Sequence, residues 1–88
     1  MNKLNCYRIK AFLEDVFKEK NIKIVIIVID KYAKNKLFWR MRITIDKNYN
    51  HLLEHIYSTA YSMCALDGEY LCKKKIRYTK IGDMLYLS

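Results

Sequence analysis

The sequence predicts a small α+β domain in which a mostly antiparallel sheet carries two helices packed on one of its faces. Apolar side chains recur with the period of a helix over residues 5–20 and again over residues 48–66. Between these segments, and after the second one, the pattern is that of extended strands. The expected order is therefore α-β-β-α-β-β. A chain of 88 residues has room for one hydrophobic core, so residues 1–88 are expected to form a single domain.

The first helix is expected over residues 5–20. Asn2 or Asn5 is a suitable N-cap, because an asparagine side chain accepts a hydrogen bond from a free backbone N–H at a helix start. Asn21 is a suitable end, since asparagine tolerates the left-handed conformation that follows many helices. The apolar stripe of this helix consists of Ile9, Phe12, Leu13, Val16 and Phe17.

Two strands are expected next, paired as an antiparallel hairpin. Residues 22–32 contain a continuous β-branched run, which is typical of an inner strand that is covered on both faces. Residues 37–46 alternate between apolar and polar side chains, which indicates one face toward the core. The basic segment Lys31–Lys36 is expected to turn the chain, with a loop of about four or five residues. The core face of the second strand consists of Leu37, Trp39, Met41, Ile43 and Ile45.

The second half of the chain is expected to add a helix and two short strands. The helix begins at Asn48 or Asn50 and reaches about residue 66. The strands are expected over residues 69–79 and 84–87, joined by a tight turn at Gly82. The apolar stripe of the helix consists of Tyr49, Leu52, Leu53, Ile56, Ala60, Met63 and Cys64.

The chain is strongly basic, and the charge is unevenly distributed. Its net charge is +8, from 17 Lys and Arg against nine Asp and Glu. Residues 20–47 alone contribute +6. Such an excess favours encounter with nucleic acid, with an acidic protein surface or with an anionic membrane.

Cysteine usage and hydropathy indicate a cytoplasmic protein. The three cysteines have no CxxC spacing and follow no signal peptide, so we expect reduced thiols. The apolar run over residues 24–29 is far shorter than the roughly 20 residues that span a bilayer. We therefore expect no membrane partner.

The string His51-Leu52-Leu53-Glu54-His55 resembles the H-x-x-E-H motif of the inverted zinc peptidases. In that family both histidines bind zinc, the glutamate activates water, and a further glutamate ligand comes from a distant downstream helix. The one glutamate after His55 in this chain is Glu69, which falls in a predicted strand. The resemblance covers five residues only, and the chain is too short for a peptidase cleft. We therefore expect no metal site.

The sequence also indicates that the protein is not an enzyme. Cys64 belongs to an apolar stripe, and Cys72 precedes three lysines without a histidine or an acid placed to form a triad. Two glycines are too few for a phosphate-binding or dinucleotide-binding loop. No cofactor is expected.

The best functional lead is a surface that combines basic and aromatic side chains. Phe38, Arg40 and Arg42 alternate with core residues, so they share the non-core face of the strand over residues 37–46. Arginines hold phosphates or carboxylates, and an aromatic ring can stack on a base. An RNP pattern, a GXXG loop, a helix-turn-helix and a zinc finger are all absent. The candidate binding residues are Phe38, Arg40, Arg42, Lys31, Tyr32, Lys34, Lys36, Lys73, Lys74, Lys75 and Arg77.

Two functions fit these observations. In the first, the chain is an inhibitor or adaptor that binds and masks a surface of a larger protein or ribonucleoprotein complex that handles nucleic acid. In the alternative, it is an accessory protein that binds nucleic acid directly. The richness in Lys, Ile, Asn and Tyr suggests an A/T-rich genome, and with the small size it is typical of phage and mobile-element proteins, such as anti-CRISPR and other anti-defence inhibitors. We expect the first function, because a compact domain without a nucleic-acid motif more often masks a surface than reads a sequence. The sequence leaves the oligomeric state open.

Overall fold

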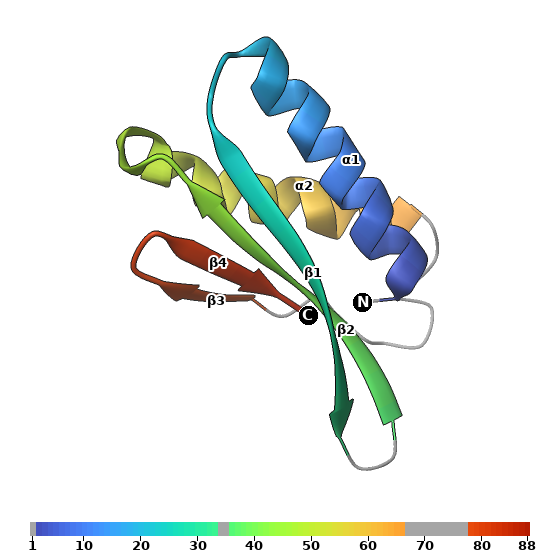
Figure 1. Ribbon diagram of the computed structural model, residues 1–88. Coiled ribbons are helices and arrows are strands. Elements are labelled where there is room, and N and C mark those ends of the chain that lie inside the picture. Colours follow the sequence, from blue (N-terminus) through green and yellow to red (C-terminus); the bar gives the residue numbers. More distant parts are fainter. Residues whose placement is uncertain (1, 34–35, 67–77) are drawn as a thin grey trace.

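The computed structural model describes residues 2–33, 36–66 and 78–88, apart from the side chains of residues 31–33, 36–38 and 66. It shows a four-stranded antiparallel sheet with both helices packed against one face (Figure 1). The predicted α+β class and α-β-β-α-β-β order are confirmed. The elements are α1 (Lys3–Glu19), β1 (Ile24–Ala33), β2 (Lys36–Ile45), the 3₁₀ helix η1 (Lys47–Leu52), α2 (Leu53–Leu66), β3 (Tyr78–Ile81) and β4 (Met84–Leu87).

Asparagines hold both ends of α1. Asn2 is the N-cap, and its Oδ1 accepts a hydrogen bond from the backbone N of Asn5 over 2.8 Å. At the other end Asn21 adopts a left-handed conformation, with φ at 57°. The N–H of Ile22 then bonds back to the carbonyl of Phe17 over 2.9 Å. This Schellman-type closure ends the helix and directs the chain into β1.

The core lies between the two helices and the face of the sheet that they cover. Most of the predicted apolar stripe of each helix is buried there. Phe12 is 46% exposed, so its assignment to the buried stripe is wrong. The buried hydrophobic side chains are Cys6, Ile9, Leu13, Phe17, Ile26, Met41, Ile43, Ile45, Leu53, Ile56, Ala60, Cys64, Leu85 and Leu87.

Strands β1 and β2 form a long regular hairpin. Pairing runs without interruption from Ile24 opposite Ile45 to Ala33 opposite Lys36. The predicted loop of about four or five residues over 31–36 is therefore wrong, because the strands continue until only two positions separate them. Positions 31–33 belong to β1 and position 36 to β2.

The order of strands in the sheet is β1-β2-β4-β3, which places β1 at an edge. Strand β4 pairs with residues 41–44 of β2, and β3 forms the opposite edge (Figure 1). The prediction that β1 is an inner strand with both faces covered is wrong. A continuous apolar run shows that a strand carries apolar side chains on both of its faces. It contains no information on how many strands or helices flank that strand.

The segment before α2 differs from the prediction. Asp46, rather than Asn48 or Asn50, caps its start, since Asp46 Oδ1 accepts a hydrogen bond from the N of Asn48 over 2.9 Å. Residues 47–52 form the 3₁₀ helix η1, which is kinked at Tyr49, and the α-helix begins only at Leu53. A tight 3₁₀ turn replaces the first turns of the expected helix.

The last two strands form the predicted two-residue hairpin. Ile81 pairs with Met84, and Gly82 takes a positive φ of 56°, a conformation that favours glycine. Most of the strand predicted over residues 69–79 lies outside the described residues. The described strand runs from Tyr78 to Ile81, and the ring of Tyr78 packs at a tilt against that of Tyr57 in α2, with ring centroids 4.4 Å apart.

Candidate functional site

The candidate site is the face of the sheet that points away from the helices, here called the open sheet face. Side chains alternate along a strand, and paired residues of antiparallel strands share a face. Arg42 therefore lies between Ile27 of β1 and Tyr86 of β4, near the centre of this face. The described strand residues of the open sheet face are Val25, Ile27, Ile29, Arg40, Arg42, Thr44, Thr79, Ile81, Met84 and Tyr86.

Much of the open sheet face is apolar and accessible. Val25 is 47% exposed and Ile27 is 38% exposed, although both are aliphatic and β-branched. Ile81 is also exposed, on the edge strand β3. An antiparallel sheet with one solvated face usually carries polar side chains there. The exposed aliphatic side chains make this face the candidate interaction surface.

Two arginines lie beside these aliphatic residues. Arg40 is paired with Ile29, and Arg42 is paired with Ile27. Both arginines are half-buried, and neither forms an ion pair with a described residue. The neighbouring side chains cover part of each arginine and leave its guanidinium group without a carboxylate partner among the described residues. A guanidinium in this state is suited to a bidentate contact with a carboxylate or phosphate of another molecule.

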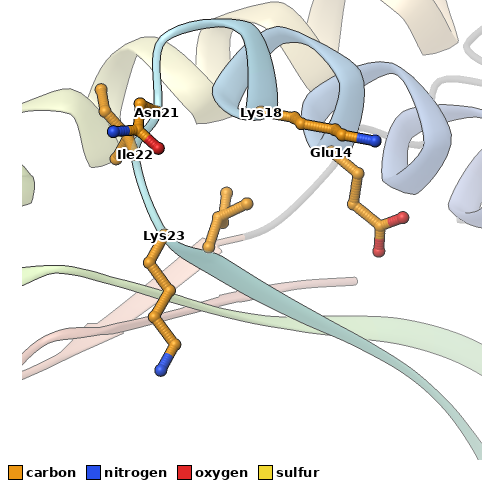
Figure 2. A pocket seen from close by; sticks show the side chains of 6 residues that line it. Glu14, Lys18, Asn21, Ile22 and Lys23 are labelled. Atoms are coloured by element: carbon orange, nitrogen blue, oxygen red, sulfur yellow. The ribbon is translucent and has the colours of Figure 1, made fainter.

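Lys23 adds a third cation at the start of β1. Its side chain is exposed and extends away from α1, on the other side of the strand from the helix (Figure 2). Lys23 thus places positive charge at one end of the open sheet face, and Arg40 and Arg42 place it along the middle. Sequence reasoning did not select Lys23, which it placed in a strand over residues 22–32 that was expected to be covered on both faces.

Only part of the predicted set of binding residues can be placed. Arg40 and Arg42 lie on the open sheet face as predicted, and the structure brings them next to Val25, Ile27 and Ile29. Strand positions whose side chains lie outside the described part are Lys31, Tyr32, Lys36 and Phe38. Wholly outside the described residues lie Lys34, Lys73, Lys74, Lys75 and Arg77.

Sequence reasoning missed the apolar half of the face. It assigned Val25, Ile27 and Ile29 to an inner strand, whereas β1 is an edge strand with one face exposed. The predicted hairpin could have indicated that one face of β1 is exposed. The alternation of its second strand implies one uncovered face, and an antiparallel partner must share that face.

The two histidines of the H-x-x-E-H string lie on either side of the boundary between η1 and α2. His51 belongs to η1 and His55 to α2, and both are exposed. The prediction of one continuous helix carrying both residues is therefore wrong. Within the described ranges, groups of three or more His, Cys, Asp or Glu that could hold a metal ion are absent. Cys64 is fully buried, in the apolar stripe where the sequence places it.

Comparison with known proteins gives no information on the function of this chain. No protein-family model, curated protein or solved structure matches this chain. Within the described residues, neither α1 nor α2 has both the length and the apolar character needed to cross a membrane.

Proposed function

We propose that this protein is a non-catalytic binding protein that docks its open sheet face onto another protein and masks the surface that it covers. The observation that carries this proposal is the exposure of Val25 and Ile27 beside two arginines without a described ionic partner. Removing exposed aliphatic groups from water lowers the free energy, so their burial by a partner favours binding. Arginine next to apolar side chains is typical of the central residues of protein interfaces.

The composition of the face favours a protein partner over nucleic acid. Proteins that bind single strands stack bases on aromatic rings. The described open sheet face has one aromatic residue, Tyr86, which is half-buried with its hydroxyl 3.9 Å from Met84 Sδ. Val25, Ile27 and Ile29 neither stack on bases nor bind phosphates. Direct binding to nucleic acid therefore leaves the apolar part of the face unused.

The same features define the chemistry expected of the target. It presents apolar groups to β1 and carboxylates to Arg40, Arg42 and Lys23. The earlier hypothesis of a target within a nucleic-acid-handling complex, inhibited in the manner of a phage or mobile-element protein, is compatible with such masking and stays a prediction.

A charge-reversal experiment tests the proposal. Tagged wild-type protein is compared with a variant that carries Arg40→Glu and Arg42→Glu, in captures from host lysate with and without nuclease. The wild type is expected to retain a protein target after nuclease treatment. The double variant is expected to lose that target while its circular dichroism stays native, because both arginines are only half-buried.

A matched control separates the face from net charge. Lys47→Glu with Lys80→Glu makes the same change in charge at exposed positions of η1 and β3. This variant is expected to retain the target. Equal retention by the Arg40 and Arg42 variant contradicts the proposal. The proposal is also contradicted if nuclease abolishes capture and the protein binds oligonucleotides directly. In that case the logarithm of the oligonucleotide affinity falls with the logarithm of the salt concentration, with a slope near −0.7 to −0.9 per neutralised phosphate.

A further inference from the structure

The outer edge of β1 is long, regular and apolar. Its pairing with β2 continues over ten residues without a bulge, and residues 24–29 contain no charged residue, glycine or proline. Among the described residues, no strand pairs with the outer edge of β1. The other edge strand, β3, has four residues and includes Lys80. Natural sheets usually protect a free edge by shortness, charge, proline or a bulge. The described part of β1 has none of these protections between Ile24 and Ile29.

An additional strand at this edge would have one side on the open sheet face and the other on the face covered by the helices, and both sides have room for its side chains. On the open side, the added strand would meet Val25, Ile27 and Ile29. On the helix side lies a hollow of about 350 Å³ between α1 and the start of β1 (Figure 2). Its lining comes from α1, β1 and the turn between them, with no contribution from β2 or α2, so it opens at the edge of the sheet. It is lined by Glu14, Lys18, Asn21, Ile22, Lys23 and Ile24.

We infer that an extended segment of an acidic protein partner adds to the outer edge of β1 as a fifth strand. This inference rests on the proposed function and specifies how the target is held. Backbone hydrogen bonds to β1 supply affinity, and alternating side chains supply specificity. The segment places apolar side chains on the helix side, where they extend the core and one enters the hollow. It places carboxylates on the open side, toward the three cations, while other apolar groups of the target cover Val25, Ile27 and Ile29.

The distances are compatible with this arrangement. Strands in a sheet lie about 4.8 Å apart, so an added strand would lie about 10 Å from β2, with β1 between them. The extended side chains of an arginine on β2 and a glutamate on the added strand together span that separation. Lys23 comes directly before β1, so a carboxylate on the neighbouring added strand reaches it directly.

Charge favours an acidic partner over a second copy of the chain. Each copy carries a net charge of +8. In a two-fold pairing of β1 with β1, the open sheet faces of both copies become one continuous face. Lys23, Arg40 and Arg42 from both copies would then share that face. Like charges across paired strands are destabilising, whereas carboxylates on the added strand neutralise the same cations.

A peptide probe tests the inference. The probe is fluorescein-labelled Thr-Val-Glu-Val-Thr-Val-Glu-Val-Thr, whose valines share one side and whose glutamates share the other. Its affinity is measured by fluorescence anisotropy, and its location by backbone amide chemical shifts and hydrogen exchange in ¹⁵N-labelled protein. Binding is expected to slow exchange at alternate amides within residues 24–30. Replacement of both glutamates by lysines is expected to weaken binding about tenfold or more, because charge-assisted contacts are lost.

A backbone-modified probe separates strand addition from simple contact with the face. The same peptide, N-methylated along its centre, keeps every side chain and charge but cannot pair at either edge. Its binding is expected to weaken about tenfold or more, as several hydrogen bonds are removed. Equal binding of the methylated peptide overturns the inference. The inference is also overturned if the unmodified peptide does not bind at about 1 mM. A third contradicting result is a protein that dimerises without peptide and thereby protects the amides of residues 24–30 from exchange.

The failures of the two proposals are distinguishable. If the methylated peptide binds equally well but the target is still lost by the Arg40→Glu and Arg42→Glu variant, the open sheet face binds the target and strand addition is wrong. If the peptide protects β1 but target capture is unaffected by that variant, the edge accepts strands and the proposed docking face is wrong.

Discussion

Asn50 and Asp83 are 33 positions apart in the sequence, and a hydrogen bond of 2.7 Å joins Asn50 Nδ2 to Asp83 Oδ1. It connects η1 to the turn between β3 and β4. Asn50 Oδ1 is buried without a hydrogen-bond partner among the described residues, so the side-chain amide is held by its hydrogen bond to Asp83. The hairpin that carries Tyr86 and Met84 is thus attached to the segment that follows β2.

Asp83→Ala is expected to lower the free energy of unfolding by about 1–3 kcal/mol, because it removes a hydrogen bond to a charged group and leaves a part-buried amide unpaired. Urea unfolding followed by circular dichroism measures this change. Asp15→Ala, at an exposed position of α1, is the control and is expected to change stability by less than about 0.5 kcal/mol. Equal effects of the two substitutions would show that the contact with Asn50 contributes nothing.

Trp39 is expected to contribute to stability rather than to binding. It is half-buried, packs against the core and lies with its ring centroid 5.5 Å from Lys3 Nζ. Trp39→Ala is expected to cost about 3 kcal/mol, the lower end of the range for emptying a large aromatic from a core. Lys3→Ala is expected to cost less than about 1 kcal/mol, since a cation–π contact at an exposed lysine is weak. Thermal unfolding measures both. An unchanged melting temperature for Trp39→Ala would indicate that the ring is free for binding.

Asn21 sets the turn that directs α1 into β1. Its φ of 57° is strained for β-branched residues and unstrained for glycine. Asn21→Gly is expected to change stability by only a few tenths of a kcal/mol, whereas Asn21→Val is expected to destabilise by about 1 kcal/mol or more. Chemical denaturation of the two variants tests this difference. Equal stability would mean that the turn does not require a left-handed residue.

The elements of this fold were predictable because their local patterns are strong. The alternation over residues 37–46 correctly placed Met41, Ile43 and Ile45 in the core and Arg40 and Arg42 on the other face. The caps at Asn2 and the turn at Gly82 follow from the chemistry of single residues. Each of these features depends on neighbours within a few positions.

The order of the strands was not predictable in the same way. Whether β1 lies inside the sheet or at its edge depends on where β4 pairs, and β4 is separated from β2 in the sequence by η1, α2 and β3. The apolar run of β1 has the same appearance in both cases. For this reason the exposed positions Val25 and Ile27 were assigned to a covered strand, and the apolar half of the candidate site was missed. The kink at Tyr49 escaped prediction because the helical spacing of apolar residues continues through it.

We expect the target to contact the open sheet face and not the exposed surface of α2. Site-specific photo-crosslinking tests it most directly, with a benzophenone amino acid at Val25 on that face or at Ser62, an exposed position of α2. Each variant is mixed with the captured target, irradiated and analysed by mass spectrometry. We expect a crosslink from position 25 and none from position 62. A crosslink from position 62 with none from position 25 would contradict the account.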